Sequence, residues 1–236
     1  MRRSQVQVVF DEPFIAIEEV SDAADSVAPL PLVVPAELPV YSWKYRYIKR
    51  ILDVVGGLVM LTLYLIPGTI IALVILITSP YPVFYSEQRI GRNGVPFRIW
   101  KFRSMRPHGV HRPHILHWRM DKRKHDPRVT TFGRFLRRWS LDEVPQLFNV
   151  LRGDMSLIGP RPVVEAETRF YKHLLPFYLA ATPGLSGLWQ VSGRSDLDYD
   201  ERARLDATYV QEWSLRSDLD IFMRTVPAVL RRVGAR

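Results

Sequence analysis

The sequence predicts an α+β, mainly helical protein that is monotopic, entering a membrane and leaving it on the same side. Three observations carry this prediction. A long apolar run occupies residues 51–78, a proline lies near its middle at Pro67, and a strand–turn–strand pattern follows at residues 82–102. Further helical patterns occur at residues 140–151, 165–181, 201–216 and 219–232. The chain has 236 residues, of which 47% are hydrophobic, and this is enough to bury a core in one domain of ordinary size.

The charge of the chain is strongly positive and unevenly distributed. A formal net charge of +9 predicts an anionic partner, which is nucleic acid, an anionic membrane surface or a phosphorylated substrate. Residues 1–43 contain two arginines and seven acidic residues, so they carry about −5 and the remainder about +14. There is no cysteine in the sequence, which excludes disulfides, thiolate metal sites and cysteine nucleophiles.

Residues 1–43 are predicted to form a flexible tail. The segment is acidic, lacks a sustained hydrophobic period and contains prolines at Pro13, Pro29, Pro31, Pro35 and Pro39. It is no signal peptide, because acidic residues follow the first arginines without a long apolar run. Its apolar residues would allow part of it to pack on the rest of the protein, at Val33, Val34, Leu38 and Val40.

The apolar run at residues 51–78 predicts insertion into a membrane. Asp53 is its only charged residue, and its length exceeds the ~20 residues that span a bilayer. A buried core helix is the alternative. Pro67 removes a backbone donor and is expected to kink or break the helix. Each half would then measure roughly 18–24 Å, which is shorter than the ~30 Å hydrocarbon core.

Basic residues flank the apolar run on both sides, and they predict its topology. Residues 44–50 form a basic and aromatic collar before it, and Arg89, Arg92, Arg98 and Lys101 follow it. Positively charged flanks stay in the cytoplasm, so two such flanks predict a re-entrant helix. One kinked spanning helix, with the body of the protein on the far side, is the alternative. At the other end of the chain, the basic amphipathic helix at residues 219–232 would lie on a membrane or cover the core.

A hairpin is predicted directly after the membrane segment. Residues 83–88 and 95–102 alternate as strands do, and Asn93-Gly94 lies between them. Asn-Gly between two alternating segments is a strong signal for a tight β-turn.

Asp142 and Glu143 are the candidate catalytic residues, although they also have a structural interpretation. Ser140 and Glu143 match a helix capping box, and Asp142 would then lie in the first turn, where the helix dipole favours an anion. The functional interpretation rests on the surroundings. Between Arg89 and Arg138 there are fifteen lysines and arginines and only two acidic residues.

This charge pattern predicts chemistry on a phosphorylated substrate. Arginine matches phosphate oxygens in a two-pronged geometry, and Arg134, Arg137, Arg138 and Arg161 surround the acidic pair in sequence. A carboxylate among arginines is expected to stay ionised, and an aspartate can attack phosphorus to form an acyl phosphate. Carboxylates beside phosphates also predict Mg²⁺.

Four histidines recur at every third residue, at His108, His111, His114 and His117. A metal site is conceivable, but Pro107, Gly109 and Pro113 prevent a regular helix from aligning them. An exposed basic loop is the preferred interpretation. The sequence contains no glycine-rich phosphate loop, no H-E-x-x-H motif and no nucleophile elbow.

Ordered motifs from about Tyr47 to Gly234 closely resemble the bacterial sugar transferases, also called monotopic phosphoglycosyl transferases. They are Lys49-Arg50-Ile-Leu-Asp53, Pro67, Gln88-Arg89-Ile-Gly91, Lys101-Phe-Arg103-Ser-Met105, Asp126-Pro-Arg128-Val-Thr130, Ser140-Leu-Asp-Glu143, the segment from Asn149 to Pro162, the segment from Pro183 to Arg194, and Tyr209-Val. The resemblance covers about four-fifths of the chain.

The resemblance implies a two-step reaction at the cytoplasmic face of the bacterial inner membrane. Asp142 would attack the β-phosphate of a UDP-sugar and release UMP. A polyprenyl phosphate, undecaprenyl phosphate in this family, would then take the sugar phosphate from Asp142. Glu143 completes the family's Asp-Glu dyad and would assist positioning or proton transfer, and Mg²⁺ is the family's metal, with Asp142 as its ligand here.

The resemblance also assigns roles to basic residues. Arg137, Arg161 and Arg194 match positions that hold phosphate or nucleotide, and Lys101 and Arg103 match a basic motif of less defined role. Lys49, Arg50 and Asp53 lie where the chain meets the membrane, and would engage lipid headgroups or tie the helix to the body. The chain is thus divided into a tail (1–43), a collar with the re-entrant helix (44–80) and a cytoplasmic catalytic domain (81–236).

The sequence departs from the family at three places: Ile66 stands where some relatives have serine before the proline, residues 106–125 are short and histidine-rich, and residues 1–43 have no counterpart. The form of the segment Trp189 to Arg194 resembles members that initiate exopolysaccharide or capsule repeats, which implies a UDP-hexose donor and downstream glycosyltransferases as partners. The sugar is left open, and so is the oligomeric state, for which a homodimer is one possibility.

Two other functions compete with this interpretation. A non-catalytic, membrane-bound scaffold of a polysaccharide synthesis complex would share the fold, but the complete Asp142-Glu143 pair argues against it. A nucleic-acid binder would explain the positive charge. The long apolar run argues against nucleic acid as the partner.

Overall fold

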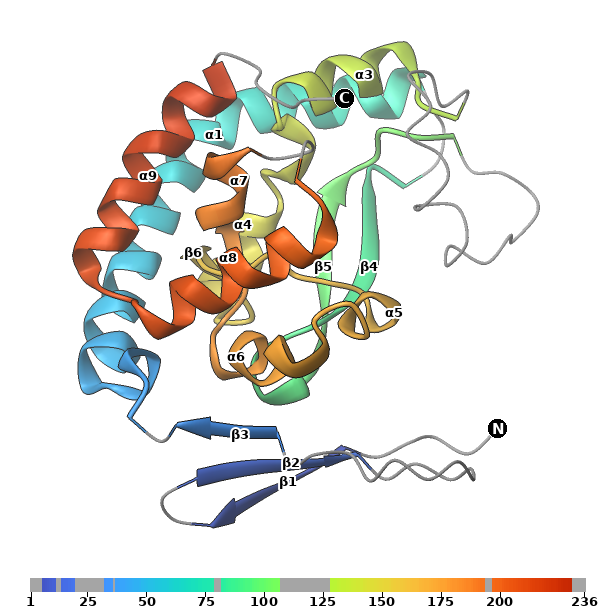
Figure 1. Cartoon of the computed structure of the whole chain (residues 1–236). Helices are drawn as coiled ribbons and strands as arrows, with labels where there is room; N and C mark the ends of the chain where they lie inside the picture. Colours follow the sequence, from blue (N-terminus) through green and yellow to red (C-terminus); the bar gives the residue numbers. More distant parts are fainter. Residues whose placement is uncertain are drawn as a thin grey trace, which may run out of the picture.

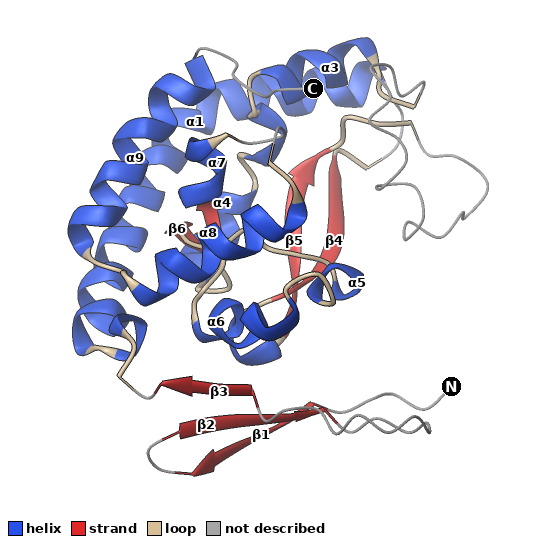
Figure 2. Cartoon of the chain, viewed as in Figure 1, coloured by secondary structure: helices blue, strands red, loops and turns tan. Residues whose placement is uncertain are grey.

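The computed structural model describes residues 6–11, 14–19, 32–35, 37–78, 82–106, 128–193 and 197–230. These residues are mostly helical, as predicted (Figure 2). The helices are α1 (Arg50–Thr78), α3 (Thr131–Arg138), α4 (Gln146–Arg152), α5 (Glu165–Thr168), α6 (Leu175–Ala180), α7 (Leu188–Ser192), α8 (Tyr199–Gln211) and α9 (Leu215–Leu230). A π-helical segment (Lys44–Lys49) leads into α1, and shorter 3-10 turns lie at Pro39–Tyr41, Arg92–Gly94, Leu141–Glu143 and Lys172–Leu174.

The described strands form three small sheets. β1 (Val6–Asp11), β2 (Phe14–Glu19) and β3 (Leu32–Pro35) form an antiparallel sheet, β4 (Phe84–Ile90) pairs antiparallel with β5 (Pro96–Phe102), and β6 (Ser156–Ile158) pairs parallel with β7 (Gly184–Ser186). The predicted hairpin is confirmed as β4 and β5. Asn93 and Gly94 have φ angles of 57° and 74°, which is the left-handed conformation that the turn requires.

The N-terminal segment contains the strands β1, β2 and β3, which were not predicted, and its role as a flexible tail stays a prediction. These ranges are rich in β-branched and aromatic residues, which favour strands despite the prolines and acidic residues around them. Leu38 and Val40, which were expected to be able to pack on the body, are buried in a core with Tyr45, Tyr209 and Trp213. The division of the chain at residue 43 stays a prediction.

Helix α1 is mostly exposed on the surface of the protein. Together with the π-helical segment it runs from Lys44 to Thr78, and it is long and apolar enough to cross a membrane. Many of its large apolar side chains are exposed, and Ile66 reaches 73%. The alternative of a buried core helix is therefore wrong.

Pro67 lies inside α1 and does not end it. Figure 1 shows the helix changing direction along its length, from a part that rises beside α9 to a part that runs below α3. A bend of this kind is the expected effect of a proline, which removes a backbone donor and crowds the preceding turn. The helix is thus bent and not broken.

Both ends of α1 pack against the same body. Near the start, Arg50 donates hydrogen bonds to the carbonyl oxygens of Val150 and Leu151, at 2.5 and 2.6 Å. Toward the end, Ile71 and Ile75 are buried in a cluster with β5 and α3 through Phe102 and Leu136. Only the middle of the helix lacks such an anchor among the described residues.

A buried polar network holds the start of the membrane helix. Lys49 is 3% exposed and donates to Asp218 of α9 at 2.7 Å. Asp218 also accepts hydrogen bonds from Tyr209 and Trp213, at 2.8 and 3.2 Å. Asp53 accepts from the Ser156 hydroxyl and from the Leu157 amide, both at 2.9 Å. Of the two roles implied for Lys49, Arg50 and Asp53, the contacts support tying the helix to the body.

Helix α9 covers the core with one face, which is one of the two roles left open for it, and exposes apolar side chains on the other face. Ile221 is buried in the core, so one face of the helix covers the body. The opposite face exposes an apolar row at Leu219, Phe222, Met223 and Val226. This row has the spacing of one helix face.

Candidate active site

Asp142 and Glu143 lie in a tight 3-10 turn between α3 and α4. The predicted capping box is wrong: Ser140 is left-handed, with φ of 54°, and makes no side-chain cap bond. The predicted helix at residues 140–151 is present as α4, but its predicted start at Ser140 is wrong, since α4 begins at Gln146. Pro145 has no N–H to donate to the carbonyl of Leu141, so a helix starting at Ser140 would lack a bond in its first turn.

Glu143 is held by lysine and arginine. Lys101, on β5, donates to Glu143 Oε1 at 2.7 Å. Burial alone would raise the pKa of Glu143, but the positive charges of Lys101, Arg161 and Arg89 outweigh it and lower this pKa to about 2. Glu143 is therefore ionised at neutral pH and is balanced by the cations around it.

Asp142 is in the opposite electrostatic situation. Its side chain is buried, with the residue only 8% exposed. Burial and the negative charge of Glu143 raise the pKa of Asp142, against the positive charges of Lys101 and Arg137. The direction of this shift is opposite to the one that neighbouring positive charges alone would cause. Of these two cations, Lys101 already pairs with Glu143, so an additional positive charge would stabilise the ionised form of Asp142.

The structure brings together three of the basic residues expected at the site. Lys101 contacts Glu143 directly, and Arg137 and Arg161 act on the acidic pair through their charges. Arg137 is oriented from α3 by a hydrogen bond from its Nε to Ser104 Oγ, at 2.9 Å. Arg103 lies just past the end of β5, where its amide donates to the carbonyl of Val83. Arg194 lies outside the described residues.

Sequence reasoning missed several residues beside these arginines. Arg89 lowers the pKa of Glu143 although it was counted only as a basic flank, and its guanidinium donates to Glu87 and to the carbonyl of Pro162. The motif Gln88-Arg89-Ile-Gly91 was the signal that could have identified it. Trp189 also lies here, with the guanidinium groups of Arg161 and Arg202 at 5.6 and 4.7 Å from its ring centre.

Asp206 of α8 is another missed residue near Arg161. It is buried and accepts a hydrogen bond from the Tyr171 hydroxyl at 2.7 Å. Burial raises its pKa to about 7, although Tyr171 and the arginines Arg161 and Arg202 oppose the shift. No signal in the sequence distinguished this aspartate from the other acidic residues of its helix.

The acidic turn lies against the later part of the membrane helix. Leu141 and Val144, which flank Asp142 and Glu143, pack against the cluster that contains Ile71 and Ile75 of α1. The turn that carries Asp142 therefore lies beside the later part of α1.

The side chains of Asp142 and Glu143 fit a metal ion whose other ligands are phosphate oxygens of a substrate. Within the part of the chain that the structure describes, no group of three or more potential metal-binding side chains occurs. Magnesium commonly uses one or two carboxylates together with substrate phosphates, and Asp142 and Glu143 are two adjacent carboxylates. The four histidines lie outside the described residues.

Comparison with known proteins matches most of the chain to one family. The pattern of the family described as "Bacterial sugar transferase" matches residues 44–232. The chain is 44% identical over 210 residues to the "Undecaprenyl-phosphate galactose phosphotransferase" of Salmonella typhimurium, covering 80% of this chain and 42% of that protein. It is 43% identical over 197 residues to the "Exopolysaccharide production protein ExoY" of Rhizobium meliloti, covering 79% and 87%.

A third relative is the "UDP-glucose:undecaprenyl-phosphate glucose-1-phosphate transferase" of Caulobacter vibrioides, 42% identical over 196 residues, covering 77% of this chain and 69% of the relative. The chain spans less than half the length of the Salmonella protein and most of the length of ExoY. The matched residues include the membrane helix, the hairpin and the acidic turn. On this match and this architecture, the chain belongs to the bacterial sugar transferase family.

Proposed function

We propose that the protein transfers a hexose 1-phosphate from a UDP-sugar to undecaprenyl phosphate and releases UMP. The observation that carries the proposal is the buried Asp142 in a turn against the membrane helix, with Glu143, Lys101, Arg137 and Arg161 grouped around it. The relatives named above act on undecaprenyl phosphate or in exopolysaccharide production, which supports the same reaction class here.

The reaction proceeds in two displacements at one phosphorus. A carboxylate oxygen of Asp142 attacks the β-phosphorus, and the bond to the bridging oxygen breaks so that UMP leaves with the electron pair. A phosphate oxygen of undecaprenyl phosphate then attacks the same phosphorus and displaces the Asp142 carboxylate. The product is a lipid diphosphate sugar, and the enzyme is regenerated.

The neighbouring residues of the turn support these steps. Arg137 and Arg161 bind the phosphate oxygens, on which negative charge is concentrated. Lys101 holds Glu143 at 2.7 Å, and Glu143 positions the reacting groups from beside the nucleophile. Trp189, between two guanidinium groups, holds Arg161 at the site. Arg103 and Arg194 complete the proposed phosphate-binding set.

Mg²⁺ is the proposed cofactor, held by Asp142 and by phosphate oxygens of the substrate. When bound, it supplies positive charge that reduces the repulsion between the carboxylates and the diphosphate. This fits the raised pKa of Asp142, which burial and Glu143 cause and which a nearby cation would counteract.

The membrane helix is proposed to be re-entrant, with both ends on the cytoplasmic face of the inner membrane. Arg50 near its start and Ile75 near its end contact one and the same body, which supports placing both ends on the same side of a bilayer. The exposed apolar middle of the helix would then enter the hydrocarbon region. The apolar row of α9 would lie at the membrane surface.

Cysteine labelling tests this topology, and the chain offers a clean background because it has no cysteine. Single cysteines at Glu37 and Val95, both exposed and on either side of the helix, are expected to react with an impermeant maleimide only after the inner membrane is permeabilised. A cysteine at Ile66 is expected to stay unreactive in intact and permeabilised membranes. Labelling of Glu37 and Val95 positions from opposite sides would overturn re-entry.

The place of the reaction in glycan assembly is proposed from the relatives. The product would be the first membrane-bound intermediate of an exopolysaccharide, capsule or O-antigen type glycan, to be extended by downstream glycosyltransferases. The relatives named above include galactose and glucose phosphotransferases, so a hexose is the proposed sugar. A homodimer is the proposed assembly. The proposed division of the chain is a tail at residues 1–43, a membrane segment at residues 44–80 and a catalytic domain at residues 81–236.

The proposed function is tested by UMP release from membranes that carry the protein. With Mg²⁺, undecaprenyl phosphate and a panel of UDP-sugars, repeated turnover to UMP is expected from a UDP-hexose, whereas without the lipid phosphate UMP release is expected to stop at about one equivalent per enzyme. Release from one donor would identify the sugar. No UMP from any donor, with the protein folded and membrane-bound, would contradict the proposal and favour a non-catalytic scaffold.

A further inference from the structure

Asn149 joins the two segments that carry the Lys101–Glu143 ion pair. It lies in α4 and is 1% exposed. Its Oδ1 accepts a hydrogen bond from the Trp100 amide at 3.2 Å, and its Nδ2 donates to the Arg98 carbonyl at 2.7 Å. Nδ2 also lies 3.3 Å from Asp154 Oδ2. One side chain thus binds both a donor and an acceptor of the β5 main chain.

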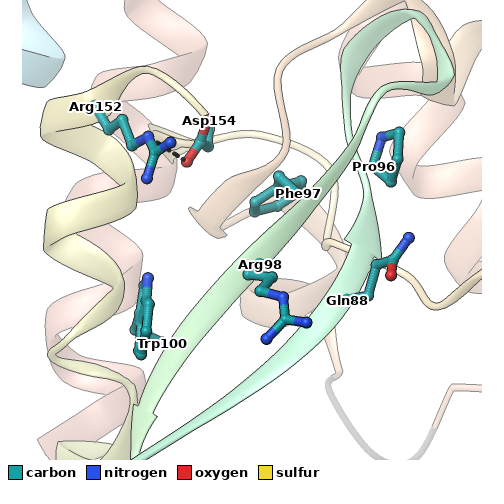
Figure 3. Close-up of a pocket in the computed structure, with 7 residues that line it drawn as sticks. All are labelled: Gln88, Pro96, Phe97, Arg98, Trp100, Arg152 and Asp154. Carbon is teal, nitrogen blue, oxygen red and sulfur yellow. Dashed lines mark ion pairs between the residues drawn. The ribbon is translucent and has the colours of Figure 1, made fainter.

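These bonds occupy the outer edge of strand β5. The β4–β5 sheet has two strands, so each strand has one edge without a strand partner. The Asn149 amide takes the place of a third strand for the segment from Arg98 to Trp100. Figure 3 shows β5 passing beside α4, with Arg98 and Trp100 on the strand and Asp154 after the helix around one pocket.

From this geometry we infer that Asn149 is a positioning residue, which fixes β5 along α4 so that Lys101 meets Glu143. Lys101 directly follows Trp100, and Glu143 lies in the turn just before α4. The bridge made by Asn149 and the bridge made by Lys101 therefore connect the same two parts of the chain. The catalytic part of this inference rests on the proposed function, whereas the positioning of Lys101 by Asn149 does not depend on that function.

Apolar packing brings β5 and α4 together without fixing their register. Ile99 is buried against Val150 and Met155. Such contacts are not directional, so they tolerate a small shift of the strand along the helix. The hydrogen bonds of Asn149 with the Trp100 amide and the Arg98 carbonyl are directional, so they do not tolerate such a shift of the strand. A shift of about 1 Å at a reacting group can cost on the order of 100-fold in rate.

A double-mutant cycle tests the inference. Asn149→Ala is expected to lower the kcat of UMP release by about 10- to 100-fold, with a smaller change in KM for the UDP-sugar. In a Lys101→Met background the same substitution is expected to change kcat by less than about 3-fold, because the ion pair that it positions is already absent. In an Arg137→Met background, Asn149→Ala is expected to lower kcat by the same factor as in the wild-type protein, because Arg137 is oriented by a hydrogen bond to Ser104 and not by the Lys101–Glu143 ion pair.

A merely structural role would give a different pattern. Asn149→Ala would then lower kcat by the same factor in the Lys101→Met and Arg137→Met backgrounds. This result would overturn the inference. If Asn149→Ala does not fold, Asn149→Asp takes its place in the cycle. It fills the same space and accepts from the Trp100 amide, but when ionised it cannot donate to the Arg98 carbonyl.

Thermal unfolding separates this test from the test of the proposed function. The same cycle, read as shifts in the unfolding midpoint of the detergent-solubilised protein, requires no turnover. The midpoint shifts of Asn149→Ala and Lys101→Met are expected to be non-additive, and those of Asn149→Ala and Arg137→Met additive. Additive midpoint shifts for both pairs of variants would overturn the inference, even if the wild-type protein releases UMP. Non-additive shifts for Asn149→Ala and Lys101→Met would support the inference, even if no UDP-sugar is turned over.

Discussion

Asp142→Asn is expected to abolish UMP release while the protein stays folded and membrane-bound. Asparagine has nearly the same volume as aspartate, but its amide is a poor nucleophile and cannot form the acyl phosphate. Loss of a nucleophile typically costs on the order of 10⁴-fold or more in kcat. Because Asp142 is buried beside Glu143, removing its charge also relieves repulsion, so no loss of stability is expected.

UMP release by membranes with each UDP-sugar measures this effect, and Asp220→Asn is the matched control. Asp220 is an exposed aspartate of α9 that pairs with Arg224 at 3.2 Å, far in sequence from the acidic turn. The control is expected to keep wild-type turnover and membrane association. Retention of most turnover by Asp142→Asn would contradict the role of Asp142 and the two-step reaction with it.

Asp218→Ala is expected to lower the free energy of unfolding by about 3–5 kcal/mol, the usual cost of removing one partner of a buried ion pair. Asp218 accepts hydrogen bonds from Lys49, Tyr209 and Trp213, at 2.7, 2.8 and 3.2 Å. Its loss leaves the buried ammonium of Lys49 with Asp53 as its nearest carboxylate among the described residues, at 4.0 Å. The start of the membrane helix would then lose its attachment to α8 and α9.

Chemical or thermal unfolding in detergent checks this prediction, with Asp220→Ala as its control. Asp220 lies two residues further along α9, and its exposed pair with Arg224 is expected to contribute at most about 1 kcal/mol. Equal stability of the Asp218 and Asp220 variants would show that the buried network does not anchor the helix.

Features that depend on neighbouring residues were predicted well from the sequence. The β4–β5 hairpin follows from alternation around Asn93-Gly94, a turn whose backbone conformation those two residues favour. The apolar run at residues 51–78 predicted a long exposed helix, and α1 is one. Pro67 predicted a disturbance of that helix, and it bends. Each signal is contiguous in sequence, so local sterics and hydropathy are sufficient to determine it.

The candidate site was predicted in part. The family motifs identified Asp142, Glu143, Lys101, Arg137 and Arg161, and the structure groups these residues. Their electrostatic balance was not predicted, because it depends on burial and on which cation lies beside which carboxylate. Lys101 is 42 residues from Glu143 and still pairs with it, and Arg89 reaches the same carboxylate from β4.

By itself, the sequence determined the β4–β5 hairpin, the long apolar helix with its proline, and the family with its acidic pair. Only the tertiary structure decided that Ser140 does not cap a helix, that Glu143 instead pairs with Lys101, and that Lys49 and Asp53 are buried in a network with Asp218 and Ser156. The physical reason is the range of the interactions. Backbone propensity and hydropathy act within a few residues, whereas hydrogen bonds and charges act between groups that only the folded chain brings within about 3 Å.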